Sequence, residues 1–473
     1  MAYFKMNKTA LIFLLIFIGK FASAQPYTLQ QCIDLAIKNN PLSKQADLNV
    51  RQSILNERQA KANLLPNLNG QFQNFYNVGR TIDRFTNQFA NATVQSMNLG
   101  LSSSVTLFSG LQNHNNILQS KINTEASKKI ADDNRNDLSL NVANAFLRVL
   151  LAKEIISVRQ KQVTLSKEQE ERTKQLFDAG VVARGNLLQA QAQIASEELQ
   201  LVNARNELSN AMLALALLVN VSSVEGFDIV SPPIPQPESL GLADNADQIV
   251  GLAMQNNPGV KGAELRVNSA EKDIQMSKGS ALPTLNLFGS LGTGYSGLAQ
   301  YITATQVNSI PVGYTADGEE VFSDVVSYTT AKSPLSRQLD ENVNKTYGVT
   351  LSVPLFNNLQ AHNRVEQAKL GKQIAALNRD QEKLNLRNEI QIAYNAALAA
   401  RNRYNAGKKN MEALEENYKY AQTRLEAGAI SVFEFNQNKT SLAQAESELL
   451  QSKYEYVFRI KVLDFYMGKP IAL

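Results

Sequence analysis

Few residues in this 473-residue chain could do chemistry. The strongest candidates are two histidines, His114 and His362, and a short acidic run, Glu168, Glu170 and Glu171. Imidazoles bind metals or move protons, but we interpret both histidines as a polar residue repeated at the junction of strand and helix, because no cysteine and no cluster of acids stands near them in the sequence. The acidic run is typical of a solvated helix face. No Gly-rich phosphate loop, nucleophile elbow or pair of catalytic carboxylates is present. The sequence therefore predicts no enzyme, no metal site and no cofactor.

Two short segments are more informative, because each interrupts a long helical pattern with an Ala-Gly pair. They are Phe177–Val182, which contains Ala179-Gly180, and Leu425–Ile430, which contains Ala427-Gly428. A glycine at such a place ends a helix in the left-handed conformation and lets the chain turn back. We therefore expect a tight turn between two long helices at Gly180 and again at Gly428.

Composition limits the partners. The chain has 47 Lys and Arg against 43 Asp and Glu, with a net charge of +4, and it shows no basic face. A protein that binds a polyanion needs a basic excess or a basic patch, so nucleic acid is not an expected partner. The single cysteine, Cys32, excludes a disulfide framework.

The N-terminus predicts export. Lys5 and Lys8 precede the apolar run ALIFLLIFIG, and Ala22-Ser23-Ala24 follows it. A basic start, a short apolar core and a small-x-small site describe a secretory signal peptide, here residues 1–24. The run is too short for a membrane-spanning helix, and no later apolar stretch reaches 18 residues.

The remaining sequence is internally duplicated. The first matches are separated by 217 residues and the later ones by 248, so about 31 extra residues lie in the second copy, between Asn286 and Tyr347. The matching pairs are 36–41 with 253–258, 65–69 with 282–286, 107–115 with 355–363, and Ala179-Gly180 with Ala427-Gly428. We interpret the copies, residues 25–220 and 251–473, as two structural repeats, and the proline-rich stretch 221–250 as a connector.

Each copy has the same order of patterns. A helix capped by Asn40 or Asn257 and begun by proline is predicted over 41–64 and 258–280. Two strands follow, over 67–76 and 99–107 in the first copy and over 284–293 and 347–355 in the second. We expect the intervening segments 77–95 and 296–345 to be long polar loops.

Very long helices come next. Residues 111–179 contain neither Gly nor Pro, enough for a helix of about 100 Å. The returning helices carry large residues every seven positions, a seam for close helix packing: Leu187, Ile194, Leu201, Leu208, Leu215 and Phe435, Leu442, Leu449, Tyr456, Leu463.

Four amphipathic strands behind an export signal cannot close a membrane barrel in one chain, because eight strands are the practical minimum. The strands either form a small soluble sheet or complete a barrel with other chains. Three chains would supply twelve strands, with every edge paired. The joint pattern of strands and long helices favours the barrel.

The doubled Asn-Asn-Pro, Leu-Pro, Leu-Phe and Ala-Gly motifs resemble those of the TolC-like outer-membrane efflux proteins, over about residues 28–467. The resemblance implies a homotrimer in outer-membrane lipid, with a twelve-stranded β-barrel continued by an α-helical barrel across the periplasm. Residues 221–250 would join an equatorial region. Such a protein is the exit duct of a tripartite efflux or secretion system. Its partners would be a periplasmic adaptor (membrane fusion) protein and an inner-membrane pump of the RND or ABC type.

The resemblance also implies roles for the two turns. They would form the periplasmic tip that the adaptor grips, through Ala179, Gly180, Val181, Val182, Ala427, Gly428, Ala429 and Ile430. Positions of the family's pore constriction correspond here to Asn186, Leu425, Glu434 and Gln437. Among these four residues only Glu434 is acidic. We therefore do not expect the polar contacts that close the tip in the family's best-studied channels.

An alternative from another class is a secreted structural coiled-coil protein without transport activity. It accounts for the heptads and the signal peptide, but not for the paired strands or the two Ala-Gly turns. Release of the protein from membranes by salt without detergent would favour this alternative.

Overall fold

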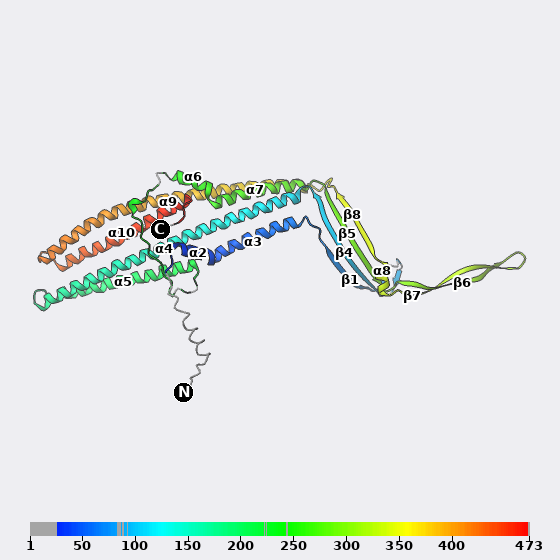
Figure 1. Ribbon diagram of the computed structural model, residues 1–473, viewed down its shortest axis with the longest axis horizontal. Coiled ribbons are helices and arrows are strands. Elements are labelled where there is room, and N and C mark those ends of the chain that lie inside the picture. The colour runs from blue at the N-terminus through cyan, green and yellow to red at the C-terminus, as the bar shows by residue number, and fades with distance from the viewer. Residues whose placement is uncertain are drawn as a thin grey trace, which may run out of the picture. The chain divides into compact units, whose positions relative to one another are not determined.

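The computed structural model describes residues 26–82, 87, 89–91, 93–221, 223, 225–242 and 245–471. The predicted signal peptide lies outside the described residues. The chain divides into two compact units (Figure 1). The helical unit comprises residues up to 54, 122–267 and 373–473, and the sheet unit comprises 55–121 and 268–372.

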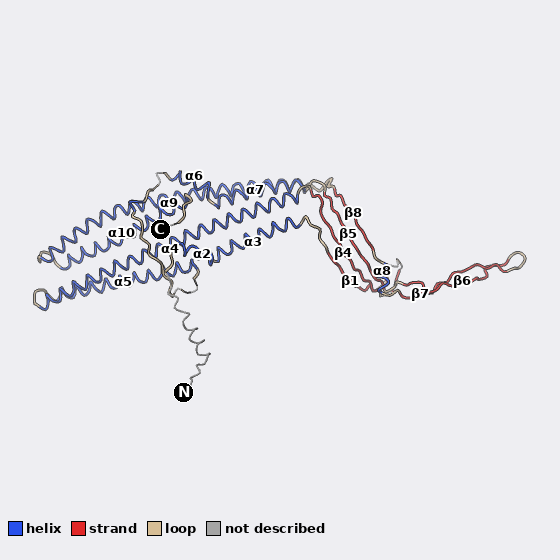
Figure 2. Tube along the Cα trace, viewed as in Figure 1, coloured by secondary structure: helices blue, strands red, loops and turns tan. Residues whose placement is uncertain are grey.

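The chain is mainly helical, with strands confined to the sheet unit (Figure 2). The helices are α2 (Leu29–Asn39), α3 (Pro41–Ala62), α4 (Gln112–Asp178), α5 (Arg184–Val219), the 3₁₀ turn η1 (Pro237–Ser239), α6 (Ala246–Asn256), α7 (Pro258–Gly279), α8 (Leu335–Glu341), α9 (Gln360–Glu426) and α10 (Val432–Tyr466). Among the described residues, no helix combines the length and the apolar character needed to cross a bilayer.

The predicted starts of α3 and α7 are confirmed. Pro41 and Pro258 are the first helical residues. The Asn40 side chain accepts a hydrogen bond from Leu42 N (2.9 Å), and the Asn257 side chain accepts one from Val260 N (2.9 Å). Proline loses nothing at this position, because the first helical N–H has no partner within the helix.

The short helices α2 and α6, which precede these starts, were not predicted. Both bury corresponding positions of the duplicated sequence, among them Cys32, Ile33 and Ala36 in α2 and Ile249, Val250 and Ala253 in α6. The first set packs in a core with Val142, Phe146 and Leu215, and the second in a core with Ile390, Ala397 and Tyr456. A signal for α2 was present, since Thr28 and Gln31 form a capping box.

The long helices match the prediction closely. α4 and α9 have 67 residues each, about 100 Å of helix. In α5 and α10 all ten residues of the predicted heptad seam are buried or half-buried, Leu215 and Leu463 almost completely.

The passage from strand to long helix uses the same unusual backbone in both copies. Gly110 and Leu111 have φ of 60° and 63°, and Asn358 and Leu359 have φ of 53° and 62°. A left-handed conformation is costly for residues other than Gly and Asn. Gly or Asn occupies the first position of each pair, and the second position is a leucine in both copies. Gly110 lies so close to Gly279 that a Cβ on either residue would stand 2.3 Å from the other's carbonyl oxygen.

The main sheet has four antiparallel strands in the order β1 (Asn69–Asn77), β4 (Val94–Ser109), β5 (Thr284–Ser296), β8 (Asn344–Ser352). The pair β4–β5 joins the two copies, with Leu101 opposite Leu291. Strand β8 ends at Ser352 rather than at the expected Leu355, because Pro354 has no N–H to donate to a ladder. A one-residue register shift interrupts β4 between Thr106 and Phe108.

The segment 296–345 is not the polar loop that we expected. It holds a hairpin of β6 (Gln300–Tyr314) and β7 (Glu320–Lys332), and then α8. Alternating residues and the turn at Asp317-Gly318, where Gly318 has φ of 84°, were hairpin signals in the sequence. Buried Gln338 of α8 accepts from Ser296 N (2.9 Å) and donates to Ser333 O (2.8 Å), which closes the base of the hairpin. The segment 77–95 also contains two short paired strands, β2 (Arg80–Ile82) and β3 (Phe89–Asn91).

Candidate functional site

The two turns between the long helices have one backbone geometry. After α4, Val181 N donates to Leu176 O and Gly180 N to Phe177 O, both at 2.8 Å, and Gly180 has φ of 74°. After α9, Ala429 N donates to Arg424 O (2.8 Å) and Gly428 N to Leu425 O (3.0 Å), and Gly428 has φ of 71°. Both are Schellman turns, which need a left-handed residue at the glycine position.

The residues of these turns present an accessible surface. Ala179, Gly180, Val181, Ala427, Gly428 and Ala429 are exposed, while Val182 and Ile430 are half-buried. Val181 is 68% exposed. Small side chains and an exposed valine leave the backbone open to contact, which is a chemistry suited to docking rather than to catalysis.

The two returning helices begin differently. Ser431 caps α10, because its side chain accepts from Glu434 N (3.1 Å). Ala183 occupies the same place before α5 and has no side-chain cap. The second turn is therefore held by one polar contact that the first lacks.

Glu434 has a partner in its own hairpin. Its Oε1 lies 3.5 Å from Nη1 of Arg424 in the last turn of α9, and both side chains are partly exposed. Arg424 also donates to Ala429 O at 3.5 Å. The acid predicted for the pore constriction is thus partly neutralised by a neighbouring guanidinium.

The other predicted constriction residues lie around the same turns. Asn186 is half-buried in the first turn of α5, and its backbone N–H donates to Ala183 O (3.0 Å). Leu425 is half-buried beside a cavity of about 110 Å³. Gln437 is exposed on α10. The single chain brings Leu425 and Glu434 to one turn, and Asn186 to the other.

The sheet has two chemically different faces. Side chains that oppose each other in an antiparallel pair lie on the same face. Leu101 opposes Leu291, Val105 opposes Leu287, and Leu287 opposes Val349. The other face carries mostly small and polar pairs, namely Gly100 with Gly292, Ser102 with Ser290, Thr106 with Asn286, and Asn286 with Thr350, and one aromatic residue, Phe288, opposite Ser104 and Gly348. Leu101, Leu287, Leu291 and Val349 are exposed in the chain, Val349 by 59%, and Val105 is half-buried.

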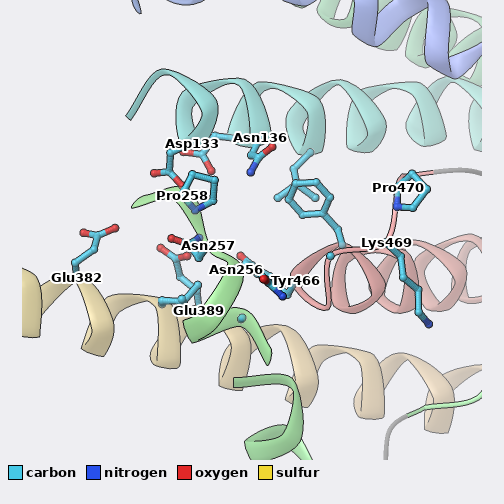
Figure 3. Close-up of a pocket in the computed structure, with 16 residues that line it drawn as sticks. Asp133, Asn136, Asn256, Asn257, Pro258, Glu382, Glu389, Tyr466, Lys469 and Pro470 are labelled. Carbon is cyan, nitrogen blue, oxygen red and sulfur yellow. The ribbon is translucent and has the colours of Figure 1, made fainter. Parts of the chain in front are cut away.

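A cavity of about 460 Å³ in the helical unit collects carboxylates from α4 and α9. Figure 3 shows Asp133 on α4 across the cavity from Glu382 and Glu389 on α9, with Asn257 between Asp133 and Glu389. Burial, and then the charge of Asp137, raise the pKa of Asp133 to about 6. Burial also raises the pKa of Glu389. The sequence reasoning missed this cluster, because Asp133 and Glu389 are 256 positions apart in the chain.

Among the described residues, no group of three or more His, Cys, Asp or Glu side chains has an arrangement that could hold a metal ion. His114 and His362 are both exposed in the first turn of a long helix. Cys32 is buried, and burial raises the pKa of its thiol to about 12.

Comparison with known proteins gives a consistent result. The model of the outer membrane efflux protein family matches residues 32–221 and 249–469. TolC of Salmonella enteritidis is 22% identical over 334 residues, which cover 70% of this chain and 61% of TolC. BepC of Brucella suis is 25% identical over 264 residues, which cover 56% of this chain and 54% of BepC. The match thus spans less than two thirds of the length of each of these two relatives.

The fold has solved counterparts. The outer membrane channel CmeC of Campylobacter jejuni superposes with a TM-score of 0.70 over 93% of this chain and 85% of its own, at 19% identity. This likeness confirms the predicted mainly helical fold with a β portion. The chain belongs to the outer membrane efflux protein family and is located in the outer membrane.

Proposed function

We propose that the protein is a homotrimeric exit duct of a tripartite efflux or secretion system. It conducts substrates passively from an inner-membrane pump across the periplasm and the outer membrane. Membership of a family of outer-membrane efflux proteins supports this function. A channel needs no catalytic group, in keeping with a protein that is not an enzyme.

One observation carries the proposal. The four-stranded sheet ends in β1 and β8, each of which pairs on one side only within the sheet. Unpaired strand edges are not tolerated in lipid. The strands alternate in direction, so β8 of one copy meets β1 of the next in antiparallel pairing, and three copies close a barrel of twelve strands.

The two faces of the sheet support the same closure. Membrane barrels alternate apolar residues toward lipid with polar residues toward the lumen. In the proposed barrel the face with Leu101, Leu287 and Val349 contacts outer-membrane lipid, and the face with Ser102, Asn286 and Thr350 lines the duct. The barrel continues into a tube of long helices.

Within each protomer we propose a signal peptide at 1–24, two equivalent halves at 25–220 and 251–473, and a connector in an equatorial region at 221–250. The turns at Gly180 and Gly428 form the periplasmic tip. A periplasmic adaptor protein docks on their exposed residues and joins the duct to a pump of the RND or ABC type.

The oligomeric state is the direct test. The protein is extracted with detergent and its mass is measured by light scattering. A trimer that forms ion-conducting channels in planar bilayers is the expected result. A monomer or dimer that conducts, or a protein that salt alone releases from membranes, would contradict the proposal.

The tip provides a second test. We place Asn186, Leu425, Glu434 and Gln437 near the constriction, where three copies of Glu434 attract cations. Glu434→Gln should lower the preference for cations and weaken block by multivalent cations. Arg424→Gln removes the neutralising partner and should have the opposite effect. If neither variant changes selectivity in single-channel recordings, Glu434 does not face the pore.

A further inference from the structure

A buried lysine joins the two helical hairpins of the chain. Lys439 of α10 has a side chain only 4% exposed, and its Nζ lies 3.5 Å from Oε1 of Glu197 on α5. It also donates to the hydroxyl of Ser166 on α4, which in turn donates to Glu197. The first hairpin, α4 and α5, is thus linked to α10 of the second hairpin through one polar cluster, defined here as the Lys439 cluster.

The cluster is well satisfied. The Glu197 side chain is 14% exposed and accepts a further hydrogen bond from Gln193 Nε2 (2.9 Å). Gln193 reaches Thr440 at 3.5 Å, a second contact between the hairpins at the same level. Burial lowers the pKa of Lys439, while the charge of Glu197 opposes this shift.

A buried pair of this kind resists separation. Pulling the hairpins apart exposes one charge or leaves it without a partner, and loss of one member of a buried pair is strongly destabilising. An exposed ion pair at the neighbouring positions, Lys167 with Glu198 at 2.7 Å, lacks this property because water screens it.

Packing becomes looser between the Lys439 cluster and the turns. A cavity of about 110 Å³ lies next to Lys439, lined by Glu168 and Arg172 of α4 and by Gln422 and Leu425 of α9. Phe435 of α10 stacks against Tyr418 of α9, within its own hairpin (5.5 Å). In the described chain, no hydrogen bond or ion pair joins the two hairpins on the turn side of Lys439.

We propose that the Lys439 cluster couples the two hairpins of one protomer into a single body and confines tip motion to the segments beyond it, about 168–190 and 418–435. Opening at the tip then bends these segments, or moves protomers relative to one another, without parting the two hairpins at the level of Lys439. This proposal rests on the proposed duct.

Hydrogen exchange on the detergent-purified full chain tests the coupling. Lys439→Met should raise exchange at least about tenfold in peptides of both hairpins, near 160–170, 193–203 and 436–446. Lys167→Met is the matched control and should change exchange by less than about twofold. An effect confined to α10, or equal effects of the two variants, would overturn the coupling.

A double variant covers the case in which Lys439→Met does not fold. Lys439→Met/Glu197→Leu leaves no buried charge, and apolar pairs of similar size often replace buried ion pairs without loss. We expect it to assemble and to regain protection within about threefold of the wild type. Failure of the double variant to regain protection would show that the unpaired charge of Glu197 is not what loosens Lys439→Met, and would contradict the argument from buried charge.

A cross-linking experiment tests the coupling of the hairpins separately from the proposed function of the protein as a duct. In Gln193→Cys/Thr440→Cys, a short thiol-reactive cross-linker that a reductant cleaves joins the hairpins beside the cluster, and conductance should stay within about twofold of the protein before cross-linking. Loss of conductance that a reductant restores would mean that the hairpins part there, and would overturn the proposal. A wild-type protein that conducts nothing would instead overturn the duct, while hydrogen exchange would still decide the coupling.

Discussion

The first hairpin (α4 and α5) and the second (α9 and α10) are entered through the same pair of left-handed residues and turn through the same Schellman geometry. Their side chains differ sharply. Gly110 of the first copy corresponds to Asn358 of the second, and Ala183 corresponds to Ser431. The two copies therefore share the backbone conformation at these positions. Their side chains differ where that conformation does not require a particular residue.

Charge shows the same divergence. Asp133 and Asp137 of α4 stand at positions that correspond to Gln381 and Asn385 of α9. The two amides bond to each other, Nε2 of Gln381 to Oδ1 of Asn385 at 2.8 Å. The carboxylates of α4 instead meet further acids of α9 in the cavity of Figure 3. At these corresponding positions α4 is therefore acidic and α9 is neutral, although both are helices of the same length.

The largest expected effect concerns the entry to the first hairpin. Gly110→Ala places a methyl group 2.3 Å from the carbonyl oxygen of Gly279 and adds strain at a φ of 60°. It should cost about 3 kcal/mol or more and greatly reduce the yield of folded protein. Asn358→Ala, at the corresponding position, should cost only about 1 kcal/mol. Thermal unfolding of both variants measures the difference, and equal losses would refute the close contact as its cause.

The next effect concerns the acidic cavity. The pKa of Asp133 is raised from 3.8 to about 6, so the folded protein binds more protons than the unfolded chain between these values. The contribution of Asp133 to stability is complete below pH 3.8 and is lost as the pH rises through 6. Asp133→Asn should therefore stabilise the helical unit at pH 7.5 by about 1–2 kcal/mol, after allowance for solvent screening.

The measurement is thermal unfolding of wild type and variant at pH 5 and pH 7.5. The variant keeps an oxygen to accept from Gly259 N, a contact of 3.1 Å in the wild type. Its gain should shrink at pH 5. A gain that is the same at both pH values would exclude titration of Asp133 as its source.

The smallest effect concerns the helix caps after the two turns. Ser431→Ala removes the bond to Glu434 N and should destabilise the start of α10 by about 1 kcal/mol. Ala183→Ser should give the first hairpin the cap that it lacks and gain up to about 1 kcal/mol. Hydrogen exchange in the first turns of α5 and α10 reports both changes. We expect exchange to become faster in α10 of Ser431→Ala and slower in α5 of Ala183→Ser. No change in either variant would show that these turns are held by packing alone.

Local signals account for what could be predicted. The prolines after Asn40 and Asn257 and the glycines at 180 and 428 act on their immediate neighbours, so helix starts and turns were found from sequence. The hairpin of β6 and β7 was missed despite its Asp-Gly turn, because the lack of a counterpart in the first copy suggested a loop. The Lys439 cluster was missed because Ser166, Glu197 and Lys439 each look like ordinary polar residues of a solvated helix.

The sequence by itself determined the duplicated order of elements, the length of α4 and α9, the seam of α5 and α10, and the two turns. Each of these depends on periodicity or on the conformational limits of Gly and Pro, which act over a few residues. The tertiary structure alone decided which polar side chains are buried, that Lys439 of α10 pairs with Glu197 of α5, and that acids of α4 and α9 share a cavity. Burial and charge pairing depend on residues brought together from distant parts of the chain, and no local pattern records them.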